Sequence, residues 1–314
     1  MYPLYMMDMD RPRKILMMVM TSLTLGIGCQ QSKTNVSKTE PIEPPKKVYR
    51  FDESKGCYSE GIVNGYVADQ SNPLKSHVVM VLSRFQKDDF SSEVLSTLCT
   101  GTLIDSNTVL TAAHCFPKNT ISTQIIASIN LFCSSGFNKR LVYSAFNVNI
   151  HPQYRHKNTP SSTSPDFDIA TVKFDGILPP PYAPLKLAPV DIRSEMTNPA
   201  SQMIMIGYGR THTTDDSLPE LRYVTKNWDQ LMLVKDSVSL IDRLNLVSIN
   251  QQDSHGGCSG DSGGPLLIAD ATGYKVVGVA SYIESASESK LCEQGQIFYS
   301  YVPSYWDWIQ EQLK

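Results

Sequence analysis

The pattern that most constrains the fold is a series of short β-forming runs that begins at Ile62. Turn-forming residues separate the runs, and almost no helical periodicity interrupts them. The clearest runs span residues 77–82, 122–129, 141–150, 171–174, 203–206, 266–268, 276–281 and 297–302. Many short strands at this spacing indicate a β-sandwich or a β-barrel. One helix is expected at residues 304–313, with Ser304 as its N-cap.

Within this β-rich region, a glycine-rich segment surrounds Ser262. Residues 260–265 read Gly-Asp-Ser-Gly-Gly-Pro, which exposes the serine hydroxyl and leaves backbone N–H groups free to converge on one point. Acyl transfer needs both a nucleophile and donors for the oxyanion. A tight turn before an apolar strand gives the same pattern, so this segment alone fits a catalytic role and a structural one.

A histidine and an acid elsewhere in the chain favour the catalytic role. A serine hydroxyl needs a histidine to take its proton, and that histidine needs a carboxylate to fix its tautomer. His114 follows small residues in the segment Leu-Thr-Ala-Ala-His-Cys, and Asp168 begins the segment Asp-Ile-Ala before an apolar strand. Asp166 competes for the role of the acid, and the Asp-Ile-Ala context favours Asp168.

These three segments resemble those of the chymotrypsin/trypsin-like serine proteases. Ile-Val-Asn-Gly at 62–65 and Gly-Tyr-Gly at 207–209 match the same family, as does Tyr-Val before the terminal helix. The resemblance covers residues 62–314. It implies an all-β fold of two packed six-stranded antiparallel β-barrels, chymotrypsin-like, with a C-terminal helix at 304–313. Barrel 1 is expected at about 62–190 and barrel 2 at about 191–302, with the active site between them.

The resemblance also implies a serine endopeptidase that needs no cofactor. Ser262 would attack the scissile carbonyl, with His114 as base and then acid, while Asp168 orients the imidazole. The N–H groups of Gly260 and Ser262 would form the oxyanion hole.

A zymogen is implied by the same family. Cleavage before Ile62 would free an ammonium group that pairs with buried Asp261 beside the nucleophile. The residue before that bond is Gly61 rather than Arg or Lys. We therefore expect an activating enzyme that prefers small residues, a second copy of this enzyme being one candidate.

The primary specificity pocket is expected to be shallow. Gly256 stands where trypsin-type enzymes carry an aspartate, so a substrate Arg or Lys would stay unpaired. The pocket strand reads Ser281-Tyr282-Ile283 where Ser-Trp-Gly is common, and Ile297 is expected as a second branched wall residue. These residues predict cleavage after small aliphatic residues, as in elastase-like members.

The chain has seven cysteines, an odd number. The family bridges two pairs, Cys99 with Cys115 and Cys258 with Cys292. Elimination pairs Cys57 with Cys133, although sequence alone does not fix connectivity.

The remaining cysteine, Cys29, follows a signal-like segment. Basic residues at 11–14 precede an apolar run at 15–28, shorter than the roughly 20 residues that span a bilayer. The end of this run resembles a bacterial lipobox, with Gly26 where leucine is usual. We expect a lipoprotein-type signal peptide at 1–28, and an ordinary secretory signal is the alternative; the initiator could be Met7 or Met9. Residues 29–61 are expected as a lipidated tether and propeptide.

Composition bears on partners and location. Net charge is −3 with 19% charged residues, and no basic stripe predicts nucleic-acid binding. We expect a monomer that acts on proteins or peptides, joined to a membrane through its lipid anchor. It would be exported to the bacterial cell envelope, at the outer membrane or the periplasmic face, or else secreted.

No metal site is expected. His151 and His156 are interpreted as solvated side chains, and His255 lies near the pocket without a cysteine or histidine partner at ligand spacing. Residues 126–139 lack the carboxylates that calcium prefers. The rival interpretation of the chain is a non-catalytic, lipid-anchored binding module on a protease scaffold. An esterase of the α/β-hydrolase type would place its serine before its acid and histidine, whereas here the serine comes last.

Overall fold

The structure is a computed structural model. It describes residues 62–68, 71–128, 141–155, 167–189, 191–196, 202–213, 220–227, 231–233, 245–270, 273–285, 287 and 290–314. All of these lie in one compact unit, Asp52–Lys314. The expected signal peptide, the tether, Asp166, His156 and three cysteines (29, 57 and 133) lie outside the described residues. The predictions made for them stay predictions.

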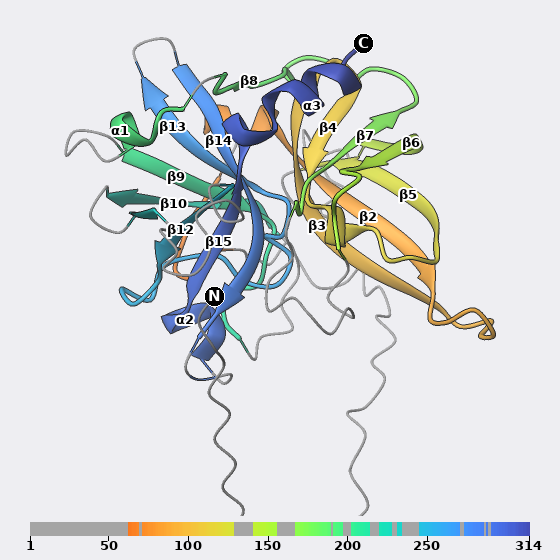
Figure 1. Cartoon of the computed structure of the whole chain (residues 1–314), viewed down its shortest axis with the longest axis horizontal. Helices are drawn as coiled ribbons and strands as arrows, with labels where there is room; N and C mark the ends of the chain where they lie inside the picture. The colour runs from red at the N-terminus through yellow and green to blue at the C-terminus, as the bar shows by residue number, and fades with distance from the viewer. Residues whose placement is uncertain are drawn as a thin grey trace, which may run out of the picture. The chain divides into compact units, whose positions relative to one another are not determined.

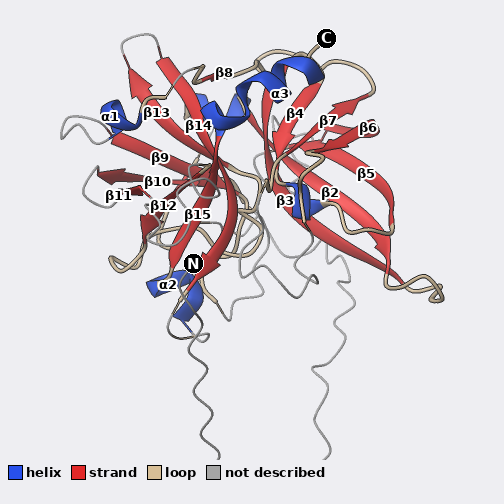
Figure 2. Cartoon of the chain, in the orientation of Figure 1, coloured by secondary structure: helices blue, strands red, loops and turns tan. Residues whose placement is uncertain are grey.

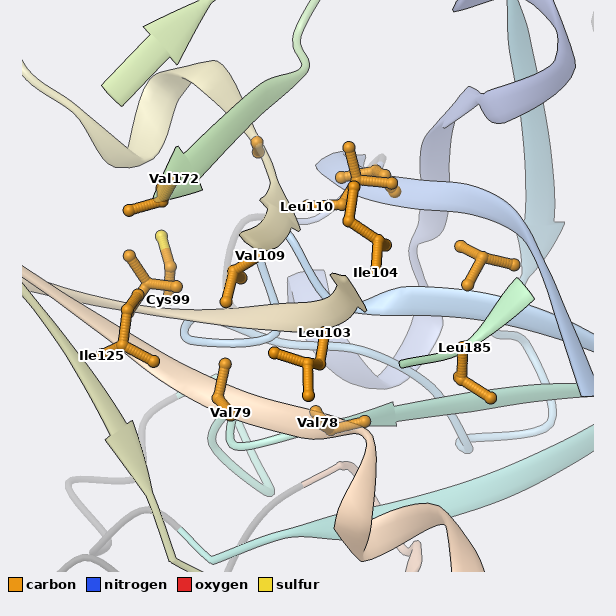
Figure 3. Packing of buried hydrophobic residues seen from close by; sticks show 14 of the residues in the cluster. Val78, Val79, Cys99, Leu103, Ile104, Val109, Leu110, Ile125, Val172 and Leu185 are labelled. Atoms are coloured by element: carbon orange, nitrogen blue, oxygen red, sulfur yellow. The ribbon is translucent and has the colours of Figure 1, made fainter. Parts of the chain in front are cut away.

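The N-terminal half of the unit is a closed, six-stranded antiparallel barrel. Its strands are β2 (Val78–Gln86), β3 (Val94–Asp105), β4 (Thr108–Thr111), β5 (Thr120–Ala127), β6 (Leu141–Ile150) and β7 (Ala170–Phe174). They pair in the order β2-β3-β4-β7-β6-β5. Apolar side chains such as Val79, Leu103, Ile125 and Val172 meet in its interior (Figure 3) and are almost wholly buried. Barrel 1 is therefore confirmed.

The second half is a sheet of nine described strands. They are β1 (Tyr66–Val67), β8 (Lys186–Leu187), β9 (Gln202–Gly207), β10 (Arg222–Asn227), β11 (Leu231–Leu233), β12 (Leu246–Asn250), β13 (Pro265–Asp270), β14 (Gly273–Glu284) and β15 (Gln296–Tyr301). The order is β1-β10-β9-β13-β14-β15-β12-β11, and β8 pairs with β14 in parallel. Figure 1 shows this sheet beside the barrel.

The all-β class is confirmed, whereas the strand count of the second half differs from the expected six. Strand β1 comes from the start of the domain and adds to the edge of β10, and β8 comes from the crossing segment and adds to β14. Pairing among the described strands leaves this sheet open. Strands dominate the whole unit, as Figure 2 shows.

Helices are few and short. They are α1 (Arg193–Met196), α2 (Leu291–Gln294) and α3 (Trp306–Gln312), with 3-10 turns at Pro73–Ser76, Ala113–Cys115 and Val302–Tyr305. Among the described residues, no helix combines the length and apolar character that crossing a bilayer requires.

The expected C-terminal helix is confirmed, but its N-cap prediction was wrong. Ser304 lies inside the 3-10 turn that contains Pro303, and the cap residue of α3 is Tyr305, without a side-chain cap hydrogen bond. Pro303 supplies the fixed φ of a first helical turn, so the chain is already helical before Ser304. Ile309 of α3 is buried in the same apolar cluster as the barrel core.

His151 also differs from the sequence interpretation, which made it a solvated side chain. It is buried, and its ring stacks on Phe167 with centroids 5.0 Å apart and lies near Tyr305 and Trp308. Burial lowers the pKa of His151, because a charged imidazole would lose hydration there. This histidine therefore helps to fasten α3 to the loop that precedes Asp168.

Candidate active site

Buried Asp168 and partly exposed His114 form a doubly hydrogen-bonded pair at one end of the barrel. Asp168 immediately precedes Ile169 and β7, and its carboxylate is inaccessible to solvent. Its Oδ2 accepts a hydrogen bond from His114 Nδ1 at 2.7 Å, and its Oδ1 accepts one from the His114 backbone N–H at 2.9 Å. These bonds fix both the ring and the turn that carries it, and they hold Nδ1 against the carboxylate.

The second sheet contributes a further hydrogen bond to this carboxylate. Ser281 on β14 donates its hydroxyl to Asp168 Oδ2, and Ser300 on β15 donates to the Asp168 carbonyl oxygen at 2.9 Å. From the sequence, Ser281 was predicted only as a pocket residue. Its contact with Asp168 depends on how the barrel and the sheet pack together, and no local pattern reports that.

Ser262 lies in a turn that only glycines can build. Gly260 has φ +103° and Gly263 has φ +80°, both in the left-handed region. A Cβ on Gly263 would lie 2.0 Å from Thr111 Oγ1, so no larger residue fits there. The turn is fastened to the barrel because Thr100 N–H donates to the Ser262 carbonyl at 2.8 Å.

One cavity joins these residues. It has a volume of about 430 Å³ and is lined by His114 and Ser262 together with pocket residues from β14 and β15. The residues that line it are His114, Pro117, Tyr154, Cys258, Ser259, Ser262, Ala280, Ser281, Tyr282, Ile283, Leu291, Cys292 and Ile297. The structure thus brings together the three residues predicted to form a triad, with Asp168 behind His114.

Asp261, next to the nucleophile, is buried among backbone donors. Its Oδ1 accepts from Gly209 N–H at 2.7 Å, and its Oδ2 accepts from Cys258 N–H at 2.8 Å. Burial raises the pKa of Asp261 to about 7, although both hydrogen bonds favour the charged form. A single buried carboxylate of this kind is costly unless a cation reaches it.

The predicted partner of Asp261 also lies in the interior. Ile62 is 1% exposed, and the next residue, Val63, pairs with Gly256: Val63 N–H donates to the Gly256 carbonyl at 2.8 Å. A Cβ on Gly65 would lie 2.7 Å from Ile62 Cγ2, so glycine at 65 makes room for the isoleucine. The start of the domain is therefore inserted into the second half.

The predicted pocket residues are only partly as expected. Ser281, Ile283 and Ile297 line the cavity, whereas Gly256 contributes no surface to it. Gly256 faces the side chain of Gln251 instead, since a Cβ at position 256 would lie 2.3 Å from Gln251 Cδ. The sequence analysis missed Gln251, and also Tyr154, which lines the cavity near Asp168.

Both disulfides that the resemblance implied are present in the described part of the chain. Cys99 on β3 is bonded to Cys115 beside His114, and Cys258 is bonded to Cys292 across the pocket. His114 and the first pair have the mutual distances of metal ligands, but a disulfide offers no thiolate to a metal. His255 Nδ1 lies 2.8 Å from the Asp253 carbonyl oxygen.

Comparisons with known proteins agree with this geometry. Residues 54–309 match the family Trypsin. Serine protease SP24D of Anopheles gambiae is 25% identical over 69% of this chain and 72% of its own length. Chymotrypsin-like elastase family member 1 of Macaca fascicularis is 26% identical over 68% and 78%, and a trypsin of Saccharopolyspora erythraea is 27% identical over 68% and 86%. The solved structure of HL collagenase shares the fold, with a TM-score of 0.58 at 21% identity, over 80% of this chain and 98% of that one.

In this fold, a β-barrel and a β-sheet meet at one cavity that a serine and a histidine line, and a buried aspartate lies behind the histidine. This combination is typical of serine-type endopeptidases. The family match extends over most of the chain. The chain therefore belongs to the Trypsin family and is a serine protease.

Proposed function

We propose that this protein cleaves peptide bonds with a triad of Ser262, His114 and Asp168. The observation that carries the proposal is the pair of hydrogen bonds from His114 to buried Asp168, at the edge of a cavity that Ser262 also lines. His114 takes the proton of Ser262 as the hydroxyl attacks the carbonyl, and later returns it to the leaving amine. Asp168 orients the imidazole and stabilises its charged form.

The oxyanion is held by the N–H groups of Gly260 and Ser262. The Gly260 carbonyl oxygen accepts from Thr100 Oγ1 at 2.8 Å, so this peptide unit is tied back into the barrel. In that orientation its flanking N–H groups can be directed at the site of the developing charge.

A fluorophosphonate probe and matched substitutions test the triad. The probe should label the active protein, and labelling should disappear in Ser262→Ala. Asp168→Asn should retain the fold and lose on the order of 10⁴ in kcat. A protein that folds, is cut before Ile62 and still resists the probe would refute the proposal. The rival, a non-catalytic binding module, predicts that outcome.

For substrate choice, we propose cleavage after Ala, Val or Thr. Ile283 and Ile297 both line the cavity with branched side chains, and none of the described residues that line it is acidic. A substrate Arg or Lys would be a buried cation without a partner. A peptide-library profile tests this, and one dominated by Arg or Lys would overturn it.

A substitution at the mouth of the pocket tests the same proposal. Ile283→Gly should raise turnover of larger apolar residues, because it removes a branched side chain from the cavity wall. The measurement is kcat/KM for peptides that differ only in the residue before the cut. Unchanged discrimination would show that Ile283 does not limit the pocket.

Activation and attachment complete the proposal. Cutting before Ile62 would supply the ammonium that buried Asp261 lacks in the intact chain. Lipidation at Cys29 would hold the protein in the bacterial cell envelope, and a Cys57–Cys133 bridge would keep the cut domain joined to its anchor. Gels of the active protein with and without reductant test this arrangement: a small N-terminal fragment should separate only after reduction.

A further inference from the structure

Gln251 is a fully buried glutamine beside the cavity that the catalytic steps do not use. It follows directly after β12, in the segment that leads to Gly256. Buried glutamines are uncommon, because a carboxamide must find partners for two donors and an oxygen once water is removed. Its contacts therefore indicate what it does.

The carboxamide bonds to both sides of the pocket. Gln251 Oε1 accepts from Gly257 N–H at 2.8 Å, and Gln251 Nε2 donates to the Gly257 carbonyl at 3.2 Å and to the Cys292 carbonyl at 2.7 Å. Cys292 is also joined to Cys258 by the disulfide. The Gly257 wall and the Cys292 wall are thus held at a fixed separation by one covalent and three hydrogen bonds.

The same side chain fills the space that a residue at position 256 would need. A Cβ on Gly256 would lie 2.3 Å from Cδ and 2.4 Å from Oε1 of Gln251. Ile297 lines the cavity and Gln251 does not, while Ile297 Cδ1 lies 2.6 Å from where a Cβ of Gly257 would be. Ile297 and the neutral carboxamide therefore both lie against the segment Gly256–Gly257, and of the two only Ile297 lines the cavity.

We propose that Gln251 is a specificity-determining positioning residue that closes the pocket behind Ile297 and restricts it to small, uncharged side chains. This inference rests on the proposed protease function. It attributes the choice of small, uncharged substrate side chains to Gln251, which does not line the cavity. A long apolar substrate side chain cannot enter deeply, because the Gln251 carboxamide, held by its three hydrogen bonds, occupies the end of the pocket. A cationic substrate side chain meets no opposite charge, because Gln251 leaves no room for an acidic side chain at position 256.

The test uses a cleared variant, Ile283→Gly with Ile297→Gly, in which both branched lining residues are removed and Gln251 remains in place. The readout is the ratio of kcat/KM for peptide anilides with Phe to those with Ala before the scissile bond. In the cleared variant this ratio should stay below one. Adding Gln251→Ala should raise it at least tenfold.

Gln296→Ala is the matched control. Gln296 adjoins Ile297 and donates from its side chain to Ser248 at 2.6 Å, but it does not line the cavity. Added to the cleared variant, it should leave the ratio unchanged. The fluorophosphonate labelling rate of each variant reports an intact triad without requiring a filled specificity pocket.

Two results would overturn the assignment of Gln251. One is a cleared variant that already prefers Phe to Ala before the scissile bond. This result can be obtained even if the Gln251→Ala protein does not fold. The other is an unchanged ratio after Gln251→Ala in a protein that labels normally. A wild-type protein, cut before Ile62, that neither labels nor hydrolyses any peptide would instead overturn the proposed function, and this inference with it.

Discussion

Asp261 lies in an environment that disfavours its charged carboxylate. Its carboxyl is buried, has two N–H donors, and has its pKa raised to about 7. In an unfolded chain the pKa of an aspartate is about 3.9. The folded state therefore binds a proton that the unfolded state has released between these two values, so this group's contribution to stability is largest below about pH 4 and falls as pH rises towards 7.

This difference in pKa predicts that the stability of the uncut protein depends on pH. In a Ser262→Ala precursor, which cannot cut itself, the free energy of unfolding should fall by about 2–3 kcal/mol between pH 5 and pH 8 through this carboxyl alone. Adding Asp261→Asn should remove that part of the slope. Urea titrations of both proteins at the two pH values measure it, and equal slopes would contradict the prediction.

Gly256 and Gln251 form a second pair that can be tested at the residue scale. Gly256→Ala should destabilise the fold by about 1–3 kcal/mol, because its Cβ would overlap the buried carboxamide. In a background of Gln251→Ala the same change should cost much less, since the obstructing atoms are gone. Thermal unfolding of the two single variants and the double variant gives the coupling. Additive costs would show that the two residues do not compete for space.

Among the elements, those that were predictable carry a local signal. Runs with β-branched and aromatic residues predicted β6 with both of its ends correct and β9, β14 and β15 to within a few residues at each end. The glycine-rich turn and the Asp-Ile-Ala segment identified candidate site residues because backbone geometry and chemistry demand those residue types there. The 3-10 turn that precedes α3 was missed. Ser304 has the chemistry of an N-cap, but the helical turn that contains Pro303 begins before it.

Contacts between distant segments were beyond sequence reasoning. His151 was interpreted as solvated because nothing near it in the chain shows that Trp308 and Tyr305 of the C-terminal segment cover it. Gln251 escaped for the same reason, since its partners lie on a wall that forms only in the folded protein. The strands β1 and β8 were also missed as parts of the second sheet, because each is only two residues long.

The disulfide between β3 and the His114 turn gives a prediction at the element scale. Cys99 and Cys115 are 16 residues apart in sequence, and a loop of this size contributes about 3 kcal/mol in the chain-entropy model. The double variant Cys99→Ser/Cys115→Ser should therefore unfold at a lower temperature in calorimetry. Wild-type protein treated with reductant is the reference and should lose more than the double variant, because reduction also opens the Cys258–Cys292 disulfide. Unchanged thermal stability in the variant would contradict the prediction.

At the scale of the whole molecule, the site exists only where the barrel and the sheet meet. Thr100 of the barrel strand β3 contacts the nucleophile turn twice: its N–H donates to the Ser262 carbonyl and its Oγ1 donates to the Gly260 carbonyl. Ser281 of β14 reaches across in the other direction to Asp168. These bonds fix the register of the two halves, so the relative positions of His114 and Ser262 depend on the packing of the whole unit.

Activation is the property that belongs to the whole chain. We propose that the intact peptide bond before Ile62 denies Asp261 an ammonium partner, and that cutting this bond would supply one beside the N–H groups of Gly260 and Ser262. We expect wild-type precursor to resist activation by trypsin because Gly61 precedes the bond, whereas Gly61→Arg precursor should be activated by trypsin. Peptide hydrolysis before and after trypsin, with mass spectrometry of the new N-terminus, measures this. Asp261→Asn in the Gly61→Arg background should be cut equally well and stay nearly inactive, because removing one partner of a buried ion pair costs about 3–5 kcal/mol.

The cut enzyme should also show an alkaline limit. A free α-amino group has a pKa of about 7.7–8.0, and the proposed pairing with Asp261 would raise the pKa of the Ile62 amino group in the folded protein. The stabilisation is then complete below about pH 7.7 and is lost as pH rises through the raised folded value. Rates of peptide hydrolysis between pH 7 and pH 11 should therefore decline at high pH and recover on return to pH 7. Full activity in a precursor whose bond before Ile62 is intact would show that the ammonium is not needed to order the site.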